Sequence, residues 1–211
     1  MGSSNYDIII IGGGVMGSSL AYHLMQDGLD GTVAVLEKDP TYKYASTALS
    51  AGGMRQQFST KVNIDIGLTS IAAIERFDEE MAVDGEKAHA ELRQVGYLFL
   101  GAEHNWETLR KQYELQKSLG VEVELLTPGD IKKLFPDMNE ESLLGGSFGP
   151  RAGYTDPYGI LQGYRRKAKS LGASYIHDEA TGILRQGDRV FGIKTAKGER
   201  IEGRSVVIAA G

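Results

Sequence analysis

Residues 7–24 read DIIIIGGGVMGSSLAYHL, and this stretch decides the fold. Its four consecutive isoleucines are typical of a β-strand that is buried on both faces. An apolar helix is predicted from about Gly14 to Gln26, with Gly28 as its end. Residues 32–37, TVAVLE, read as a second buried strand. Together these segments predict a βαβ unit with a right-handed crossover and parallel strands.

The glycines between strand and helix have the spacing G-x-G-x-x-G, at Gly12, Gly14 and Gly17. The first glycine permits a tight turn, the second lets the backbone approach a pyrophosphate, and the third lets the helix pack closely on the strand. Free N–H groups and the positive end of the helix dipole then face the phosphates. The sequence therefore predicts a dinucleotide site at this loop.

Glu37 ends the second strand, 25 residues after Gly12. A carboxylate at this place can accept both ribose hydroxyls of an adenosine, and it repels the 2′-phosphate of NADP. The alternative is a glycine-rich turn in some other doubly wound protein, with Glu37 as a solvated strand end. Agreement of strand, glycines, helix, Ala21 and Glu37 within one βαβ unit favours the dinucleotide.

Composition excludes several classes of function. The 211 residues suit one large domain or two small ones, and the net charge of −5 without basic runs disfavours nucleic acid as a partner. No apolar run approaches the ~18 residues of a membrane span. The chain has no cysteine, so disulfides and thiolate chemistry are excluded. Metal binding is not predicted either, because the four histidines stand far apart: His23, His89, His104 and His177.

The remaining chain is predicted to alternate helices and strands around a small-residue loop at 46–58, STALSAGGMRQQF. Helices are expected around 64–74, 106–113, 127–136 and 155–172, and strands at 96–101, 121–126, 173–186, 189–196 and 199–211. Tight turns at 187–188 and 197–198 are expected to join the last three strands.

Over nearly its whole length the chain resembles the FAD-dependent amine and amino-acid oxidoreductases of the D-amino-acid oxidase superfamily. The resemblance is strongest to the sarcosine oxidase and dimethylglycine dehydrogenase branch, including mitochondrial FAD-dependent oxidoreductase-domain proteins. The matching segments, in family order, are IIIIGGGVMGSSLAYHL (8–24), VAVLEKD (33–39), STALSAGGMRQQF (46–58), AGYTDPYGILQGYRRKAKSLGA (152–173) and VVIAAG (206–211). The most specific of them is SAGGMRQQF, residues 50–58.

The resemblance implies an α/β fold in which a Rossmann-like FAD-binding domain, with a parallel sheet and a β-meander, is joined to part of an antiparallel-sheet substrate domain. We expect the FAD-binding domain at residues 1–82 and 150–211, and the substrate-domain segment at 83–149. The family continues beyond the point that Gly211 matches. We therefore expect an N-terminal portion that does not turn over substrate alone, with the missing C-terminal part as a candidate separate chain.

The resemblance implies FAD as the cofactor. Some dimethylglycine-type enzymes attach FAD through a His in the early loop, but no His or Cys occurs between Asp39 and Phe58, so we expect non-covalent FAD. Loop hydroxyls can bind phosphates and ribityl oxygens, and glycines allow approach to the isoalloxazine. The expected cofactor contacts are Gly12, Gly14, Val15, Met16, Gly17, Glu37, Lys38, Ser46, Thr47, Ser50, Gly52, Gly53, Met54 and Arg55, and, by resemblance alone, Ala180, Ala210 and Gly211.

Arg55 is the candidate catalytic residue. Beside the flavin it would stabilise negative charge on the reduced ring or attract a substrate carboxylate. The alternative for Arg55 is a surface salt bridge. In sarcosine oxidases a second basic residue follows three positions later, where this chain has Phe58. Flavin electrostatics or substrate charge are therefore expected to differ here.

The function that the resemblance implies is oxidation of a secondary amine or amino acid, of the sarcosine, dimethylglycine or amino-acid type, by hydride transfer to flavin N5. Three alternatives remain: a flavin dehydrogenase of a hydroxy acid or glycerol phosphate, a non-catalytic FAD-binding assembly factor, and an NAD-binding module. The expected partner is a small-molecule amine or amino acid. The expected compartment is the cytoplasm, or the mitochondrial matrix in a eukaryote.

Overall fold

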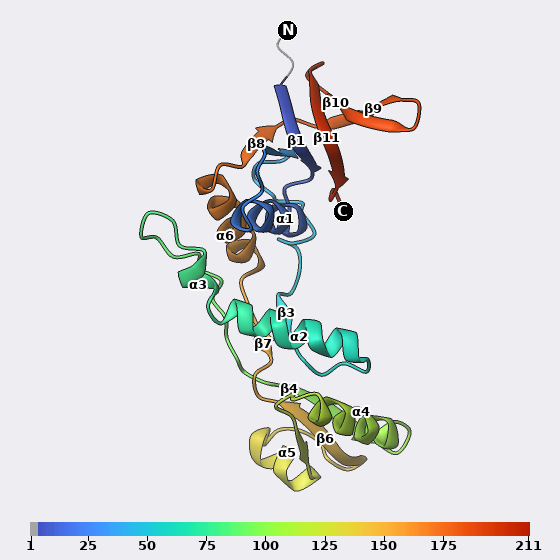
Figure 1. Ribbon diagram of the computed structural model, residues 1–211. Helices are drawn as coiled ribbons and strands as arrows, with labels where there is room; N and C mark the ends of the chain where they lie inside the picture. Colours follow the sequence, from blue (N-terminus) through green and yellow to red (C-terminus); the bar gives the residue numbers. More distant parts are fainter. Residues whose placement is uncertain (1–3) are drawn as a thin grey trace. The chain divides into compact units, whose positions relative to one another are not determined.

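The structure, a computed structural model, describes residues 4–211, which pack into two compact units (Figure 1). Unit 1 consists of the described residues up to Ser50, of Phe77–Ala90 and of Asp156–Gly211. Unit 2 consists of Ala51–Arg76 and Glu91–Thr155. Both units are therefore built from segments that are far apart in the sequence.

Unit 1 contains a six-stranded sheet in the order β8-β2-β1-β11-β10-β9. The strands are β1 (Ser4–Ile11), β2 (Val33–Glu37), β8 (Ser174–His177), β9 (Ala180–Gln186), β10 (Arg189–Thr195) and β11 (Arg200–Ile208). β8, β2, β1 and β11 run parallel, whereas β11, β10 and β9 form an antiparallel meander. The predicted α/β class, with a parallel sheet followed by a β-meander, is confirmed.

The central strand β1 of this sheet is apolar and buried along its second half. Ile9 and Ile10 are fully buried, so β1 is covered on both faces, as its run of isoleucines predicts. Helices α1 (Val15–Gln26) and α6 (Pro157–Ser170) lie side by side and pack against each other (Figure 1). The predicted βαβ unit is therefore present, and its crossover helix starts directly after the glycine loop. A short helix, α3 (Phe77–Glu80), completes the unit.

Unit 2 contains a three-stranded antiparallel sheet in the order β4-β6-β5 and a small two-stranded sheet of β3 and β7. Its elements are α2 (Lys61–Ile74), α4 (Trp106–Ser118), α5 (Pro128–Leu134), β3 (Gly53–Met54), β4 (Tyr97–Ala102), β5 (Glu124–Leu126), β6 (Leu143–Gly149) and β7 (Gly153–Tyr154). Ile64 of α2 packs with Val121 and Val123 in a buried cluster. The antiparallel sheet agrees with the expected substrate-domain architecture.

Two predicted strands differ from the structure. Residues 173–186 form two strands, because β8 pairs with β2 whereas β9 pairs with β10 at the opposite edge of the sheet. The break falls at Asp178, which is buried. Its N–H donates to the carbonyl of Glu37 in the neighbouring strand β2, and its carboxylate accepts from the adjacent Glu179 N–H. Strand β5 starts at Glu124, later than predicted, because Val121 and Val123 fill the core instead of pairing.

Strand β6 was not predicted, because its sequence LLGGSFG resembles a loop more than a strand. One of its glycines, Gly145, is explained by a bulky neighbour. A Cβ on Gly145 would lie 2.6 Å from the Trp106 ring, and a Cβ on the facing Gly101 of β4 would lie 2.3 Å from it. The bare backbone therefore makes room for the indole of α4.

The expected division into an FAD-binding domain (1–82 and 150–211) and a substrate-domain segment (83–149) is a functional one and stays a prediction. By packing, residues 51–76 group with 91–155. None of the helices within residues 4–211 is both long and apolar enough for a membrane crossing. Over the same described residues, no cluster of three His, Cys, Asp or Glu side chains could hold a metal ion.

Candidate functional site: a nucleotide cradle in unit 1 and a cationic cavity in unit 2

The glycine loop of unit 1 is shaped by two close approaches of the backbone. Gly12 has φ +100°, and a Cβ there would lie 2.5 Å from the Ala209 carbonyl oxygen. A Cβ on Gly17 would lie 1.9 Å from the Gly12 carbonyl oxygen. Gly14 is different, because a Cβ there would meet only the Thr47 hydroxyl, at 3.8 Å. Gly12 and Gly17 are thus needed for packing, whereas Gly14 leaves the face of the loop open.

Glu37 connects the end of β2 to this loop. Its Oε2 accepts a hydrogen bond from the Gly13 N–H over 2.8 Å, and its Oε1 accepts one from the Asp39 N–H over 2.8 Å. A carboxylate has about four acceptor positions, so two remain available for hydroxyl groups of a ligand. Glu37 therefore stabilises the loop and can still bind a ribose.

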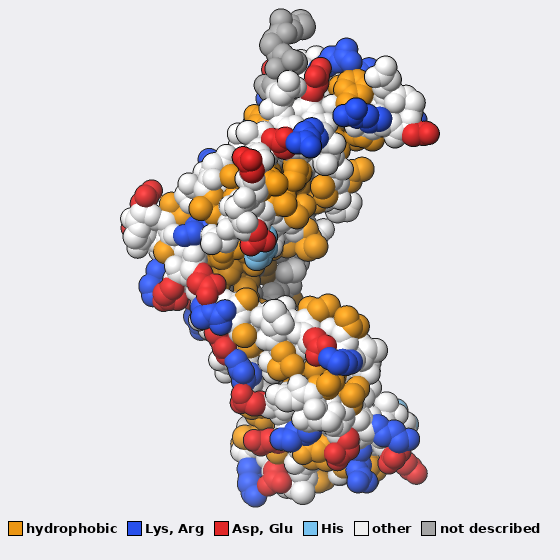
Figure 2. All heavy atoms as spheres, in the orientation of Figure 1, with side chains coloured by type: hydrophobic (Ala, Val, Ile, Leu, Met, Phe, Trp, Pro, Cys, Tyr) orange, Lys and Arg blue, Asp and Glu red, His pale blue; other side chains and the backbone are white. Residues whose placement is uncertain are grey.

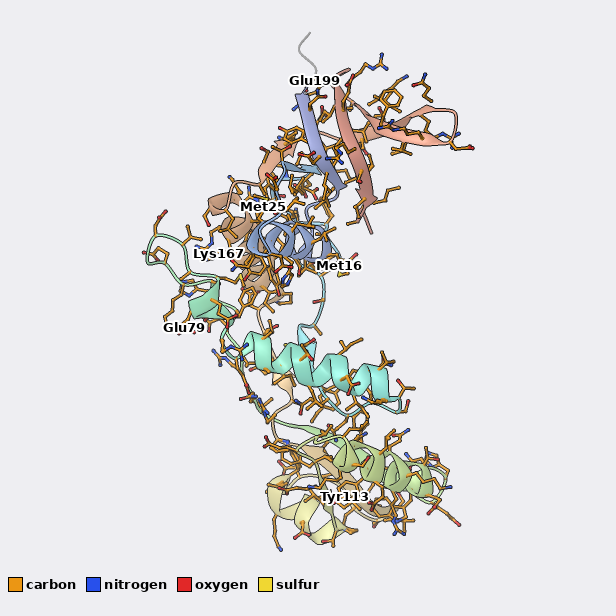
Figure 3. The ribbon with its side chains drawn as sticks, in the orientation of Figure 1. Met16, Met25, Glu79, Tyr113, Lys167 and Glu199 are labelled. Atoms are coloured by element: carbon orange, nitrogen blue, oxygen red, sulfur yellow. The ribbon has the colours of Figure 1, made fainter. Side chains whose placement is uncertain are left out.

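A cavity of about 430 Å³ opens in front of the loop. Thr47 reaches the start of α1, where its hydroxyl accepts from the Val15 N–H over 3.2 Å. Met16, which is 74% exposed, projects from the same end of the helix (Figure 3). The cavity gathers ten of the predicted cofactor contacts: Gly12, Gly14, Val15, Met16, Glu37, Lys38, Ser46, Thr47, Ala210 and Gly211. Gly17 is buried on α1 and does not line this cavity.

A second cavity of about 120 Å³ shares Gly12, Glu37, Lys38 and Ala210 with the first. Ala180, at the start of β9, lines this smaller space. The two together offer a pocket beside a carboxylate, an open glycine face and a helix N-terminus. This donor and acceptor set suits an adenosine joined to a pyrophosphate, so the residues present fit the adenosine diphosphate half of a dinucleotide.

Aromatic and cationic side chains support the cradle from within, and no sequence pattern pointed to them. Tyr42 is buried, and burial raises its pKa to about 12. The Arg165 guanidinium lies 5.8 Å from the centre of the Tyr42 ring and 5.5 Å from that of Tyr175. The Tyr175 hydroxyl donates to the Ser18 hydroxyl over 3.0 Å. Ser18 and Tyr42 are far in sequence from Arg165 and Tyr175, and the four residues share no spacing, so no local pattern joins them.

The predicted cofactor loop is divided between the two units. Ser46, Thr47 and Ser50 belong to unit 1, whereas Gly52, Gly53, Met54 and Arg55 belong to unit 2. Within unit 2, Gly53 and Met54 form β3, and the Gly52 carbonyl accepts hydrogen bonds from the backbone and the hydroxyl of Thr155. The contacts of all these residues with a cofactor stay predictions.

Arg55 lies on an aromatic platform in unit 2. The centres of the Phe58, Tyr97 and Phe99 rings lie 5.0, 5.6 and 5.4 Å from its guanidinium carbon. Within the described part of the chain, the contacts found for the Arg55 guanidinium are with these rings, and none of the salt bridges found there includes it. Rings at these distances attract the cation and restrict its motion.

Two buried glutamines hold the backbone next to Arg55. The Gln57 side-chain amide donates to the Ser147 carbonyl of β6 over 3.0 Å. The Gln116 side-chain amide donates to the Phe58 carbonyl over 3.0 Å. The loop is therefore fixed to β6 and α4 on either side of Phe58. Gln57 falls inside the SAGGMRQQF segment, but nothing in the sequence pointed to Gln116.

A cavity of about 490 Å³ in unit 2 has Arg55 in its wall. Phe58 and Tyr97 of the platform line it, together with residues of α2 that include Ile66. Ile66 and Val62 are 59% and 62% exposed, and apolar side chains come to the surface over α2 (Figure 2). The cavity thus combines one cation with mainly apolar walls, which suits a small molecule that carries a carboxylate.

Comparison with known proteins agrees with this architecture. The family model described as DAO, FAD dependent oxidoreductase, matches residues 7–211. The chain is 41% identical over 180 residues to "FAD-dependent oxidoreductase domain-containing protein 1" of Xenopus laevis, covering 83% of this chain and 36% of that protein. It is 30% identical over 216 residues to "Sarcosine oxidase subunit beta" of Arthrobacter sp, covering 98% of this chain and 51% of that protein.

Among solved structures, the L-proline dehydrogenase from P. horikoshii superposes with a TM-score of 0.86 at 29% identity. The match covers 99% of this chain and 54% of that one. The chain thus spans about a third to a half of the length of these relatives.

Proposed function

We propose a function for this chain from its family, since it belongs to the DAO family of FAD-dependent oxidoreductases. The chain forms the nucleotide cradle and part of the substrate site of an enzyme that oxidises a secondary amine or an amino acid. The observation that carries the choice of substrate is Arg55, a cation on three aromatic rings in the wall of a cavity of about 490 Å³. We assign Arg55 to the substrate carboxylate.

The chemistry of the guanidinium supports this assignment. Its planar fork presents parallel N–H donors that match the two oxygens of a carboxylate. Phe58, Tyr97 and Phe99 make the surroundings less polar than water, so the attraction between opposite charges is stronger there. Sarcosine and L-proline, named in two of the relatives, are both secondary amines that carry a carboxylate.

FAD, when bound, accepts the hydride equivalent from the α-carbon of the substrate. A secondary amine enters this step neutral, loses the α-hydrogen with its electron pair and also the N–H proton, and becomes an imine. Dimethylglycine, a tertiary amine without an N–H, would become an iminium ion, and water hydrolyses either product. The share of Arg55 is to fix the carboxylate and with it the orientation of the α-carbon. The share of Glu37 and the glycine loop is to hold the nucleotide end of the cofactor.

Because the chain spans only part of its relatives, we propose this activity for a protein that also contains the rest of the family fold, on the same chain or on a separate one. The compartment, cytoplasm or mitochondrial matrix, also stays a prediction.

Anaerobic titration of the flavin-loaded protein tests the proposal. Sarcosine, dimethylglycine and L-proline are each added while the visible flavin bands are recorded, and at least one should bleach them. Arg55→Met should raise the substrate concentration for half-bleaching about 100-fold, because a charged hydrogen bond is lost. For pyrrolidine, which lacks the carboxylate of L-proline, the substitution should leave the concentration for half-bleaching unchanged. Full flavin occupancy without bleaching by any amine would overturn the proposed reaction.

A further inference from the structure

We propose that the buried hydroxyl of Ser18, held by Tyr175, orients the glycine loop so that its N–H groups point at the pyrophosphate of the cofactor. Ser18 stands on the first turns of α1 and is fully buried. Its hydroxyl donates to the carbonyl oxygen of Gly13, five residues earlier, over 2.7 Å. This bond connects the body of the helix to the loop that precedes it.

Because of the geometry of the peptide group, this bond also sets the direction of the N–H of the next residue, Gly14. In a trans peptide the C=O of one residue and the N–H of the next point in opposite directions, and no peptide bond among the described residues is cis. A Gly13 carbonyl drawn inward onto Ser18 therefore turns the Gly14 N–H outward. Gly14 lines the cavity of about 430 Å³, so its N–H faces the space in which the fit places a phosphate.

Gly13 is fixed at both ends. Its N–H donates to the Glu37 carboxylate and its C=O accepts from Ser18. A glycine has more backbone freedom than any other residue, and without such bonds the loop would sample several orientations. The two bonds pre-order the loop, so less conformational entropy remains to be lost when a phosphate binds.

Tyr175 and Arg165 extend this support outward. Tyr175, on the edge strand β8, donates its hydroxyl to the Ser18 oxygen, which leaves the Ser18 proton for Gly13. The Arg165 guanidinium lies over the rings of both Tyr175 and Tyr42. A continuous set of contacts thus runs from α6 through β8 to the glycine loop. Ser18 and Tyr175 are positioning residues, since they act on the cofactor through Gly13 and Gly14.

The chain contains a matched control beside this pair. Ser19 follows Ser18 on α1, and its side chain lies close enough to the Tyr164 hydroxyl of α6 to oppose part of the rise that burial causes in the Tyr164 pKa. The two pairs contain the same residue types, serine and tyrosine, and both serines lie on α1. They differ in that the Ser18 hydroxyl continues to the glycine loop. Ser18→Ala and Tyr175→Phe can therefore be compared directly with Ser19→Ala and Tyr164→Phe.

The inference rests on the family's cofactor and not on the proposed amine substrate. We would measure the dissociation constants of FAD by fluorescence, and of ADP and adenosine by calorimetry, for the four variants and the unchanged chain. Ser18→Ala should weaken FAD and ADP about tenfold and Tyr175→Phe about threefold, as expected for the loss of one oriented hydrogen bond. Adenosine has no phosphate, so its affinity should stay unchanged. The Ser19 and Tyr164 variants should match the unchanged chain for all three ligands.

Several outcomes would overturn the inference. An equal loss for ADP and adenosine would show that Ser18 acts only on the general shape of unit 1. Equal effects of the Ser19 and Tyr164 variants, or no effect of the Ser18 and Tyr175 variants, would show that the bond from Ser18 to the Gly13 carbonyl has no specific role in binding. An unchanged chain that binds neither FAD nor ADP would refute the oriented cradle itself. Failure of amines to bleach a tightly bound flavin would instead count against the proposed reaction alone.

Discussion

The Glu37 carboxylate accepts a hydrogen bond from the Gly13 N–H over 2.8 Å, so the end of β2 is bonded directly to the loop that follows β1. The same carboxylate also accepts from the Asp39 N–H, which orders the chain just after the strand. One side chain thus links two parallel strands at the edge where a nucleotide of this family would lie. Its structural role and its proposed ligand role can be separated by substitution.

Glu37→Gln should weaken FAD binding about tenfold, because the amide keeps the size of the side chain but presents an NH₂ group to one of two N–H donors. Fluorescence titration of the flavin measures the change. Glu107→Gln is the control, since Glu107 is exposed and forms a salt bridge with Lys111 at 3.7 Å on α4. An unchanged dissociation constant in Glu37→Gln would contradict the assignment of Glu37 to the ribose and the loop.

Gly17→Ala should lower the free energy of unfolding by about 2–3 kcal/mol, because the new methyl would overlap the Gly12 carbonyl oxygen and push α1 away from β1. The contact would be 1.9 Å without such a shift. Urea denaturation measures the loss. At Gly182, where a Cβ would meet no atom within 4 Å, the same substitution should be nearly neutral. Equal stabilities of the two variants would mean that α1 tolerates the displacement.

Tyr42 should make the protein sensitive to alkali. Its pKa in the folded state is about 12, mainly because of burial, whereas a tyrosine in an unfolded chain titrates near 10. The folded state therefore keeps the proton longer, so this stabilisation is complete below pH 10 and is lost as the pH rises towards 12. The loss is on the order of 2 kcal/mol.

Urea unfolding of Tyr42→Phe at pH 8, 10 and 11 tests this expectation. The variant should lose less stability between pH 8 and 11 than the unchanged chain does. Tyr44→Phe is the comparison, because Tyr44 is 77% exposed. If Tyr42→Phe and the unchanged chain show the same pH slope, the Tyr42 phenol does not control the alkaline loss.

The Glu75–Arg151 ion pair of unit 2 is suited to a test at acidic pH. The guanidinium contacts both carboxylate oxygens, at 2.7 and 2.6 Å from one nitrogen, and both side chains are about one-third exposed. The hydrogen bond from Arg151 lowers the pKa of Glu75. A lowered folded-state pKa stabilises the protein above the unfolded value and loses this effect as the pH falls through the folded one.

Glu75→Gln should therefore cost about 1 kcal/mol at pH 7, a value reduced for solvent screening, and the cost should fade below about pH 4. Urea unfolding at pH 7 and pH 3.5 provides both numbers. A cost that is the same at both pH values would show that the charge of Glu75 contributes nothing.

The parallel core of unit 1 could be predicted because its signals are local. The isoleucines of β1, the glycine spacing and Glu37 fall within residues 8–37, and each has a short-range physical meaning. Gly12 and Gly17 in particular have the tight turn and the close packing that their spacing predicts. The loop residues Ser46 and Thr47 also reach the cavity that the resemblance implied.

The support behind the cradle could not be predicted, because it depends on tertiary contacts. Tyr42, Arg165 and Tyr175 have no shared spacing and meet only after the sheet has formed. Strand β6 was missed for a related reason. Its glycines are unfavourable for an isolated strand, and the Trp106 ring, which occupies the space beside Gly145, is not near that glycine in sequence.

The order of the sheet has a consequence for biosynthesis. β1 pairs with β2 on one side and with β11 on the other, so Ile8 lies beside both Val33 and Ser205. The Ala209 N–H then bonds the Ile11 carbonyl, next to the turn at Gly12. Pairings of such long sequence separation form slowly. While the chain emerges from the ribosome, one edge of β1 remains open until residues 200–209 have been made, so the cradle that starts the sequence is among the last parts of unit 1 to be completed.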